Sequence, residues 1–557
     1  MIIKLNKSLI SFFKYSFYFV VITYFNFAVA QVDTSNKKET YSNPKKLNIE
    51  VSNLEKPSLG SIGVKTKLNN IMGLDIWKDM SATNIVEHFS YIPDVVTSKS
   101  LQDLLIQLYL SSSNPPSGTS EEIIKFLETR LFKLKSSGQS EKLYQLINQL
   151  PDGERWNIWK QWIIEYELIG RQDQKACSNV YEGSKNNSDH FWQTARIFCL
   201  SINDKVSQAE FILDLLKVKG FEDPIFENLF QIMNNEKEKF ELKNKDTQIL
   251  PIHLIMMDTI KIPIKINYIA HLGIEYTESL LKLTYLTPKA RSFLLDKKIN
   301  FTFVSTDQII LDYKSVSDGV IDIENSISNY KKIPNGQSRA NVWFSVLSIK
   351  DEVKKAETIL NFLKLEMKVG RFYDSVNLYL PTLNKIKNSS LTKELNDTIR
   401  KINIASNPEL YDGNKLANIL MLKKDKEWDW NLILSQKAWP IIPVIERAGM
   451  IGPENIKWLD FINKFNQNSF DEKTYNKWNR NFDLDTYILS KSIEQAAKEN
   501  KKSLTILLVA RLVNNNPFED FDLNYLLIIR KALVDIGFED LANNITYEIM
   551  TSKIINF

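Results

Sequence analysis

The chain has 557 residues, of which 43% are hydrophobic and 25% charged, a composition typical of a folded protein and not of a disordered or collagen-like one. Glycine and proline number only 17 each, about 3% of the chain against a usual value of roughly 5–7%, so the breakers that all-β folds need are scarce and helix is favoured. The formal charge of +4, from 71 basic and 67 acidic residues, leaves no basic excess of the kind that nucleic-acid binding requires.

Residues 1–30 predict a secretory signal peptide. Three lysines precede an apolar run of about 13 residues, and the run is followed by an A-x-A cleavage pattern at Ala28 and Ala30. The apolar run is short for a membrane span, which needs about 20 residues. We therefore expect cleavage near Ala30, a mature chain that begins at Gln31 without a membrane span, and a periplasmic or secreted location.

The mature chain is expected to be helical throughout its folded part. Residues after the signal are rich in Lys, Asn and Ser with little periodicity, and beyond them apolar residues recur at helical spacing. Five segments are predicted: a signal peptide at 1–30, a flexible polar leader at 31–58, tetratricopeptide-like helical repeats at 59–240, a central helical region at 241–425 and C-terminal helical hairpins at 426–557.

Regularly spaced turn residues predict the architecture. Gly138, Gly170 and Asn203 each separate two apolar-periodic stretches, and Gly and Asn are the residues that adopt the left-handed conformation at a helix end. Ala176 and Ala209 each follow a turn by six residues and would let paired helices approach closely. The spacing resembles tetratricopeptide repeats of about 34 residues. We predict an all-α fold, an α-solenoid or irregular superhelix of stacked helical hairpins that is partly tetratricopeptide-like.

Two interpretations compete for residues 296–335. Apolar residues in this stretch are compatible with short strands: Phe301, Phe303, Ile309, Ile310, Val320 and Ile321. Thr306 and Asp307 would instead cap a helix that runs through Tyr313, and we favour the helix.

The chain has only two cysteines, Cys177 and Cys199. In an oxidising compartment such a pair forms a disulfide, and the predicted loop at 183–189 would place both residues at nearly the same height on antiparallel helices. A bond would stabilise the fold by roughly 3 kcal/mol through the entropy of the unfolded chain. The alternative is a pair of buried thiols that pack as small hydrophobic side chains.

Trp156, Trp159 and Trp162 fall within a sector of about 120° on one helix. They are predicted either to line a concave aromatic groove that anchors a peptide or glycan, or to form core between stacked helices.

No motif for catalysis, a cofactor or a metal is present. The glycines form neither a P-loop nor a dinucleotide fingerprint, G-x-S-x-G is absent, and the four histidines are too scattered for a zinc motif. We therefore predict no catalytic, cofactor-binding or metal-binding residue. The isolated histidines are interpreted as capping or core-edge residues.

Several structural motifs resemble those of an uncharacterised exported bacterial helical-repeat (tetratricopeptide-like) protein family with no assigned reaction. The similar features are these: Gly73-x-x-x-Trp77, the Pro115-Pro116-x-Gly118 loop followed by Arg130-Leu131, Ala176-Cys177 with Trp192 and Cys199, and the final hairpin around Gly537. The resemblance implies helical architecture and export, and it assigns no functional residue.

These features favour a non-enzymatic function. We expect an exported scaffold or binding protein of the cell envelope, whose partner is another protein or an extended polymer and not a nucleic acid. The alternative is an envelope hydrolase that acts on cell-wall material, with catalytic carboxylates dispersed over several helices and roughly 5–9.5 Å apart in the fold.

Overall fold

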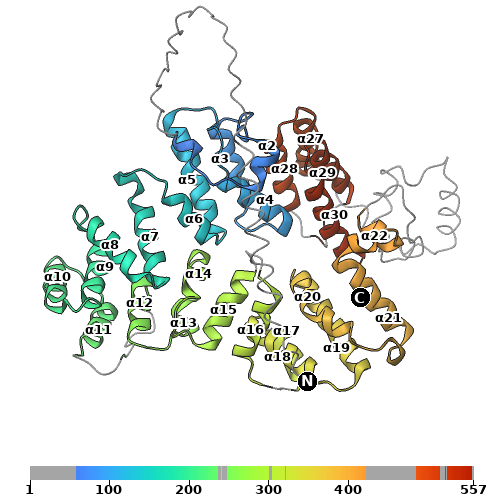
Figure 1. Ribbon diagram of the computed structural model, residues 1–557. Helices are drawn as coiled ribbons and strands as arrows, with labels where there is room; N and C mark the ends of the chain where they lie inside the picture. The colour runs from blue at the N-terminus through green and yellow to red at the C-terminus, as the bar shows by residue number, and fades with distance from the viewer. Residues whose placement is uncertain are drawn as a thin grey trace, which may run out of the picture. The chain divides into compact units, whose positions relative to one another are not determined.

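The structure is a computed structural model, and it describes residues 58–235, 240, 248–299, 304–319, 322–421, 484–514, 518, 521 and 523–554. These residues form 25 α-helices and no strand, so the predicted all-α fold is confirmed (Figure 1). The predicted signal at 1–30 and the predicted leader up to residue 57 lie outside the described residues, as does 422–483 within the C-terminal part. None of the helices among the described residues is both long and apolar enough to cross a membrane.

The first helices pack around a buried aromatic cluster. They are α2 (Lys67–Met72), α3 (Ala82–Tyr91), α4 (Lys99–Leu110), α5 (Ser120–Ser136) and α6 (Ser140–Ile147). Thr119 and Glu122 form a capping box that fixes the start of α5, with the Thr119 backbone N–H donating to the Glu122 carboxylate over 2.7 Å. The fully buried Trp77 meets the ring of Phe126 edge-on with 5.3 Å between centroids. This cluster joins α3 and α5 to the segment that follows α2.

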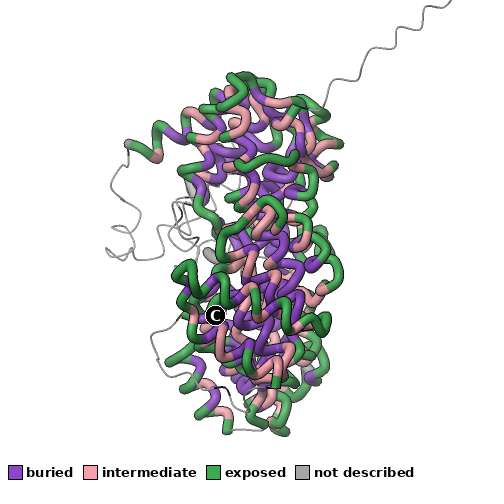
Figure 2. Tube along the Cα trace, turned by 90° about the vertical axis from the view of Figure 1, so that its left-hand side faces the viewer, coloured by how far each residue is buried: buried purple, intermediate pink, exposed green. Residues whose placement is uncertain are grey.

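Helical hairpins follow with a regular turn. They comprise α7 (Asn157–Ile169), α8 (Asp173–Gly183), α9 (His190–Ser201), α10 (Val206–Val218), α11 (Pro224–Met233) and α12 (Pro251–Thr259). Ala176 and Ala209 are fully buried, as expected for residues between paired helices. Figure 2 shows the resulting alternation of buried and exposed residues along the chain.

The left-handed turn residues recur at a period of 33. They are Gly138, Arg171 and Asp204, with φ of 70°, 58° and 57°. The prediction is therefore confirmed at Gly138 and wrong by one residue at Gly170 and Asn203. In both of these turns the backbone N–H of the residue after the left-handed one bonds the carbonyl five residues earlier, as from Gln172 to the Glu167 carbonyl over 2.8 Å. That bond closes when the residue just before the donor is left-handed.

The central region is helical as well. It contains α13 (Ile266–Ile269), α14 (Thr277–Leu280), α15 (Pro288–Ile299), α16 (Thr306–Val316), α17 (Ile323–Lys332), α18 (Gly336–Ser348), α19 (Glu352–Lys368) and α20 (Phe372–Leu383). The helix favoured over Thr306 to Tyr313 is confirmed, and Ser305 caps it by accepting from the Gln308 N–H. Ile309 and Ile310 are helical, whereas Phe301, Phe303, Val320 and Ile321 lie outside the described residues.

A buried ion network joins the helices of the central region. Arg339 on α18 pairs with Asp296 on α15 over 2.7 Å and with Glu366 on α19 over 3.0 Å. Arg371, directly before α20, also reaches Asp296 over 3.3 Å. Because both arginines and Glu366 are buried, each charge is compensated where water cannot screen it. The network therefore fixes the packing of four helices and needs no ligand to explain it.

The last helices contact the first ones. They are α21 (Lys393–Ser406), α22 (Lys415–Leu420), α27 (Leu484–Lys498), α28 (Lys502–Asn514), α29 (Leu523–Asp535) and α30 (Glu539–Ile554). One hydrophobic cluster contains buried residues from 62–166 together with residues from 404–550, and α30 packs against α4. The Glu548 carboxylate of α30 accepts hydrogen bonds from Ser98 and Ser100 at the start of α4. The two ends of the folded chain thus share a core.

Short 3-10 turns complete the described elements. They are η1 (Leu59–Ser61), η2 (Glu154–Trp156), η3 (Ile274–Tyr276), η4 (Asn388–Ser390) and η5 (Pro408–Tyr411).

Candidate functional site

Of the two alternatives for the tryptophan stripe, the structure agrees with core between helices and not with an open groove. Trp156, Trp159 and Trp162 are only 3–4% exposed and belong to the hydrophobic core. Trp159 packs on the Phe132 ring of α5, and Trp162 stacks on Tyr166 of its own helix. A neighbouring helix therefore covers the stripe, as in the core alternative, and these side chains are unable to anchor an extended ligand.

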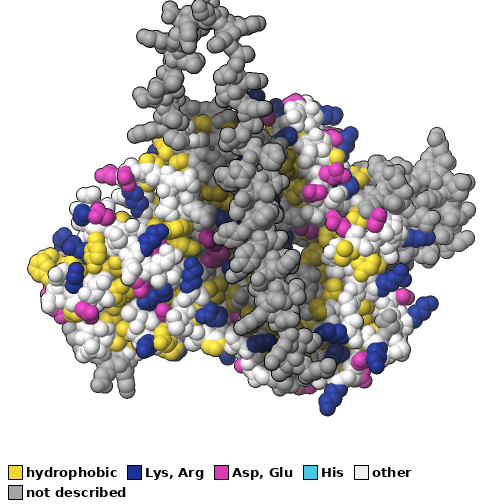
Figure 3. Space-filling view, in the orientation of Figure 1, with side chains coloured by type: hydrophobic (Ala, Val, Ile, Leu, Met, Phe, Trp, Pro, Cys, Tyr) yellow, Lys and Arg dark blue, Asp and Glu magenta, His cyan; other side chains and the backbone are white. Residues whose placement is uncertain are grey.

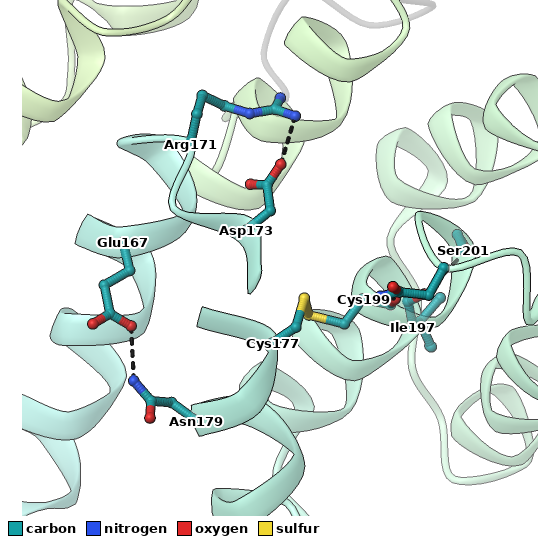
Figure 4. The surroundings of a disulfide bond; sticks show 9 residues. Glu167, Arg171, Asp173, Cys177, Asn179, Ile197, Cys199 and Ser201 are labelled. Atoms are coloured by element: carbon teal, nitrogen blue, oxygen red, sulfur yellow. Dashed lines mark hydrogen bonds and ion pairs between the residues drawn. A yellow bond between two sulfur atoms is a disulfide. The ribbon is translucent and has the colours of Figure 1, made fainter. Parts of the chain in front are cut away.

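The two cysteines lie at disulfide distance. Cys177 on α8 and Cys199 on α9 have Cα atoms 5.5 Å apart, and Figure 4 shows the bond between the two helices. Both side chains are buried. Neighbouring contacts are structural as well, because Glu167 accepts a hydrogen bond from Asn179 over 2.8 Å and Arg171 pairs with Asp173 over 2.8 Å. The pair joins adjacent hairpin helices, and neither cysteine lines the α9–α10 surface or the pocket between α15 and α16 described below.

The most buried histidine caps a helix. His253 Nδ1 accepts from the Leu250 N–H over 3.1 Å, and its Nε2 lies 2.9 Å from a carboxylate oxygen of Asp223. Burial opposes ionisation of Asp223, but hydrogen bonds from His253 and the backbone outweigh it and hold the pKa of that carboxyl below its ordinary value. His271 bonds the Ile249 carbonyl. Within the described ranges no group of three potential metal ligands converges.

An exposed apolar face on α10 is the strongest candidate for a binding surface. Phe211, Leu215 and Val218 are 64%, 46% and 86% exposed and follow one another at i, i+4 and i+7 on one side of the helix. Hydrophobic side chains gather over α10 in the space-filling view (Figure 3). The opposite side of α10 buries Ala209, Leu213 and Leu216 against α9, so this helix carries more apolar residues than its packing uses.

A groove of about 460 Å³ lies between this face and α9. We define the α9–α10 groove by six of its lining residues: Arg196, Gln208, Phe211, Ile212, Leu215 and Lys219. Its volume is within the range of roughly 300–1,000 Å³ that ligand sites occupy.

The two charged residues that line the α9–α10 groove, Arg196 and Lys219, are both basic. Nε of Arg196 is buried and has no hydrogen-bond partner, and neither Arg196 nor Lys219 forms an ion pair with any described residue. No carboxylate lines the groove. By contrast, the nearby Lys217 is neutralised by Glu227 over 3.0 Å. An unpaired guanidinium N–H beside exposed apolar surface favours a ligand that brings both a hydrogen-bond acceptor and apolar groups.

The α9–α10 groove is not among the sites predicted from the sequence. Residues 206–218 nevertheless indicate it, because apolar side chains occur there on more than one face of the helix. A single apolar stripe is enough to pack this helix on its neighbour, so the additional apolar residues point to a second contact surface.

The fold and the groove define a class of protein, an all-α protein of stacked helical hairpins with an open apolar and cationic surface. No known protein family, curated protein or solved structure matches the chain.

Proposed function

We propose that the protein is an exported helical-repeat binding protein of the cell envelope that uses the α9–α10 groove to dock a partner protein. The occupant is an amphipathic helix whose apolar face is flanked by Asp or Glu. The exposed apolar face of Phe211, Leu215 and Val218 carries the proposal, because monomeric proteins rarely leave a contiguous apolar surface open without a function.

The shape and charge of the groove support this occupant. The i, i+4, i+7 spacing forms an apolar ridge along α10 beside the groove. In helix-in-groove recognition the apolar face of the partner helix lies in such a groove and packs against the ridge that borders it. Arg196 and Lys219, which form no ion pair with the described residues, attract carboxylates on the flanks of that helix. A basic helix would instead be repelled.

Export is part of the proposal. It is supported by the signal-like residues 1–30 and by a cysteine pair at disulfide distance, which is typical of oxidising compartments. The partner would accordingly be another envelope protein.

Two synthetic helical peptides test the docking. Both carry the same apolar face, one with Glu and the other with Lys on its flanks, and each is titrated against the full mature protein by fluorescence anisotropy. We expect the Glu peptide to bind at least tenfold more tightly. The double variant Phe211→Ser/Leu215→Ser should lose roughly 10- to 100-fold in affinity. Full burial of one apolar side chain contributes about 1.5–3 kcal/mol, and both side chains are already partly buried in the free protein, so only part of that energy is gained on binding.

A matched variant controls for loss of surface hydrophobicity. Ile333 is equally exposed and lies at the end of α17, so Ile333→Ser should bind the Glu peptide like the wild type. Equal affinity of the two peptides, or an unchanged affinity in the double variant, would refute the proposed occupant. If the free protein dimerises with rising concentration and the double variant does not, the groove binds a second copy of the chain instead.

The hydrolase alternative stays a prediction without a supporting observation. It requires two carboxylates that face one cleft, and the α9–α10 groove contains none.

A further inference from the structure

A second pocket lies between α15 and α16, and its first lining residue, Leu281, comes 62 residues after Lys219 of the α9–α10 groove. Its volume is about 500 Å³, and we call it the α15–α16 pocket. Leu281, Leu295 and Leu311 supply apolar walls, whereas Arg291, Lys298 and Asp312 supply charged groups. Apolar walls with a few charged groups are typical of small-molecule sites.

Asp312 is the unusual residue of the pocket. It is 6% exposed, and its Oδ1 has no hydrogen-bond partner in the part of the chain that the structure describes. Leaving a buried carboxylate oxygen unpaired is costly, by about 1–3 kcal/mol or more. Burial raises the pKa of the Asp312 carboxyl to about 7, with Arg291 acting against the shift and Asp296 adding to it. The packing of α16 supplies no donor for Oδ1 of Asp312. A ligand that donates a hydrogen bond to this oxygen would account for the buried carboxyl.

Arg291 provides the opposite charge. Its Nη1 and Nη2 donate to the carbonyls of Leu281 and Leu283 over 3.0 and 3.1 Å, which holds the guanidinium in place. Arg291 has no carboxylate partner among the described residues. Lys298, by comparison, already pairs with Glu278 over 3.4 Å.

Arg291 and Asp312 line one pocket without forming an ion pair at 4.0 Å or closer. The guanidinium of Arg291 and the carboxylate of Asp312 attract each other but are not in contact. The pocket can therefore hold a ligand that carries a negative group for Arg291 and a positive group for Asp312. A molecule with an anionic and a cationic end satisfies each charge, whereas a simple anion or cation satisfies only one.

We propose that the α15–α16 pocket binds a small zwitterion of the amino-acid type, with its ammonium group on Asp312, its carboxylate at Arg291 and an apolar side chain against the leucine walls. A free amino acid and a short peptide both present this chemistry, and the test separates them. The site is independent of the docking groove, so either can fail without the other.

Several other charged groups on the helices that pack on α16 already form ion pairs. From α15, Asp296 pairs with Arg339 and Arg371. From α18 and α20, which also pack on α16, Arg339 and Asp374 are held in the buried ion network. Ionisation of Asp312 is therefore the change that should govern ligand binding near neutral pH.

Calorimetric titration of the full mature protein tests the site with five probes: leucine, leucine methyl ester without a carboxylate, 4-methylpentanoic acid without an ammonium group, and the peptides Leu-Leu and Leu-Leu-Leu. We expect saturable binding of leucine or of a peptide, and at least tenfold weaker binding of the ester and the acid. Preference for leucine identifies a free amino acid as the ligand, and preference for a peptide identifies a short chain. Absence of saturable binding by all three zwitterions, or equal binding of leucine and the acid, would overturn the proposal.

Two further measurements separate binding from stability. Asp312→Asn should lose at least tenfold in affinity, while Asp307→Asn on the exposed side of the same helix should bind like the wild type. The affinity of the wild type should rise roughly tenfold from pH 6 to pH 8, because only the ionised carboxylate binds the ammonium group, and Asp312→Asn should show no such rise. The wild-type pH profile needs no variant to fold, and a flat profile contradicts the assigned role of Asp312.

Discussion

Arg130 shows how one buried side chain organises the N-terminal helices. It is fully buried on α5, and its guanidinium donates to the carbonyls of Tyr109, Ser111 and Ile62 over 2.7, 2.8 and 3.0 Å. Burial lowers the pKa of Arg130 to about 9, so the side chain is still charged at neutral pH. Arg130 thereby supplies donors to three carbonyls, at the end of α4 and after η1, that accept no backbone hydrogen bond within a helix.

We expect Arg130→Met to lower the stability of α4 and α5 strongly. The substitution keeps much of the side-chain volume but leaves three buried carbonyls without a donor, at a cost of about 1–3 kcal/mol each. In hydrogen exchange, the protection factors of amides in α4 and α5 should fall at least about 100-fold. This fall corresponds to a loss of about 3 kcal/mol in the free energy of opening. Arg130→Lys should be intermediate, because an ammonium group lacks the planar fork.

Arg155→Met is the matched control. Arg155 is exposed and pairs with Glu121 and Glu128 on the surface, where ion pairs contribute about 0–1 kcal/mol. If Arg130→Met changed protection no more than this control does, the three hydrogen bonds would not be the reason for the burial of Arg130.

At the level of elements, the sequence predicted local features well. The helices, the turn at Gly138 and the closely packed alanines follow from periodicity and residue type. The two displaced turns were mispredicted because Arg171 and Asp204 adopt the left-handed conformation despite having side chains. The tryptophan stripe was ambiguous for a physical reason, since helical phase defines a face but not whether a neighbour covers it. The surplus apolar face of α10 and the approach of Arg291 to Asp312 likewise depend on packing.

The hairpin of α8 and α9 gives a direct test of the cysteine pair. Alkylation of the exported protein in denaturant without reductant should add no mass, because both thiols are engaged at disulfide distance. The same intact mass should correspond to a chain that begins at Gln31. Two added alkyl groups would show free thiols and assign both cysteines to ordinary packing, and a mass that retains 1–30 would refute cleavage near Ala30.

Contacts between distant parts of the chain are the least predictable feature of the whole molecule. Helices at the end of the chain share a core with helices at its beginning, and Lys99 on α4 pairs with Asp374 on α20 over 2.5 Å. Repeat periodicity describes how each hairpin packs on its neighbour, and it contains no information on which non-adjacent helices meet. Polar residues such as Glu548 look like ordinary surface positions in the sequence.

Glu548 tests whether these distant contacts stabilise the fold. Its carboxylate is almost completely buried and accepts from the Ser100 hydroxyl over 2.7 Å and from the Ser100 N–H over 3.1 Å, as well as from Ser98, at the positive N-terminal end of α4. Glu548→Ala leaves these donors unpaired, so we expect amides of α30 and of the first turn of α4 to lose roughly 30- to 1,000-fold in protection, about 2–4 kcal/mol. Asp540→Ala, in the exposed first turn of α30, should change protection only slightly.

The pH dependence of this loss has a definite sign. Burial raises the pKa of Glu548 above its ordinary value of 4.5, although hydrogen bonds from Ser98 and Ser100 oppose the shift. A carboxyl with a raised pKa in the fold contributes stability that is fully present below its unfolded pKa and is lost as the pH rises through its folded pKa. Glu548→Ala should therefore cost more at pH 4 than at pH 8. A cost that is independent of pH would contradict the raised pKa of Glu548. A cost confined to α30, without any change in α4, would show that the contact between the two ends of the chain does not depend on this carboxyl.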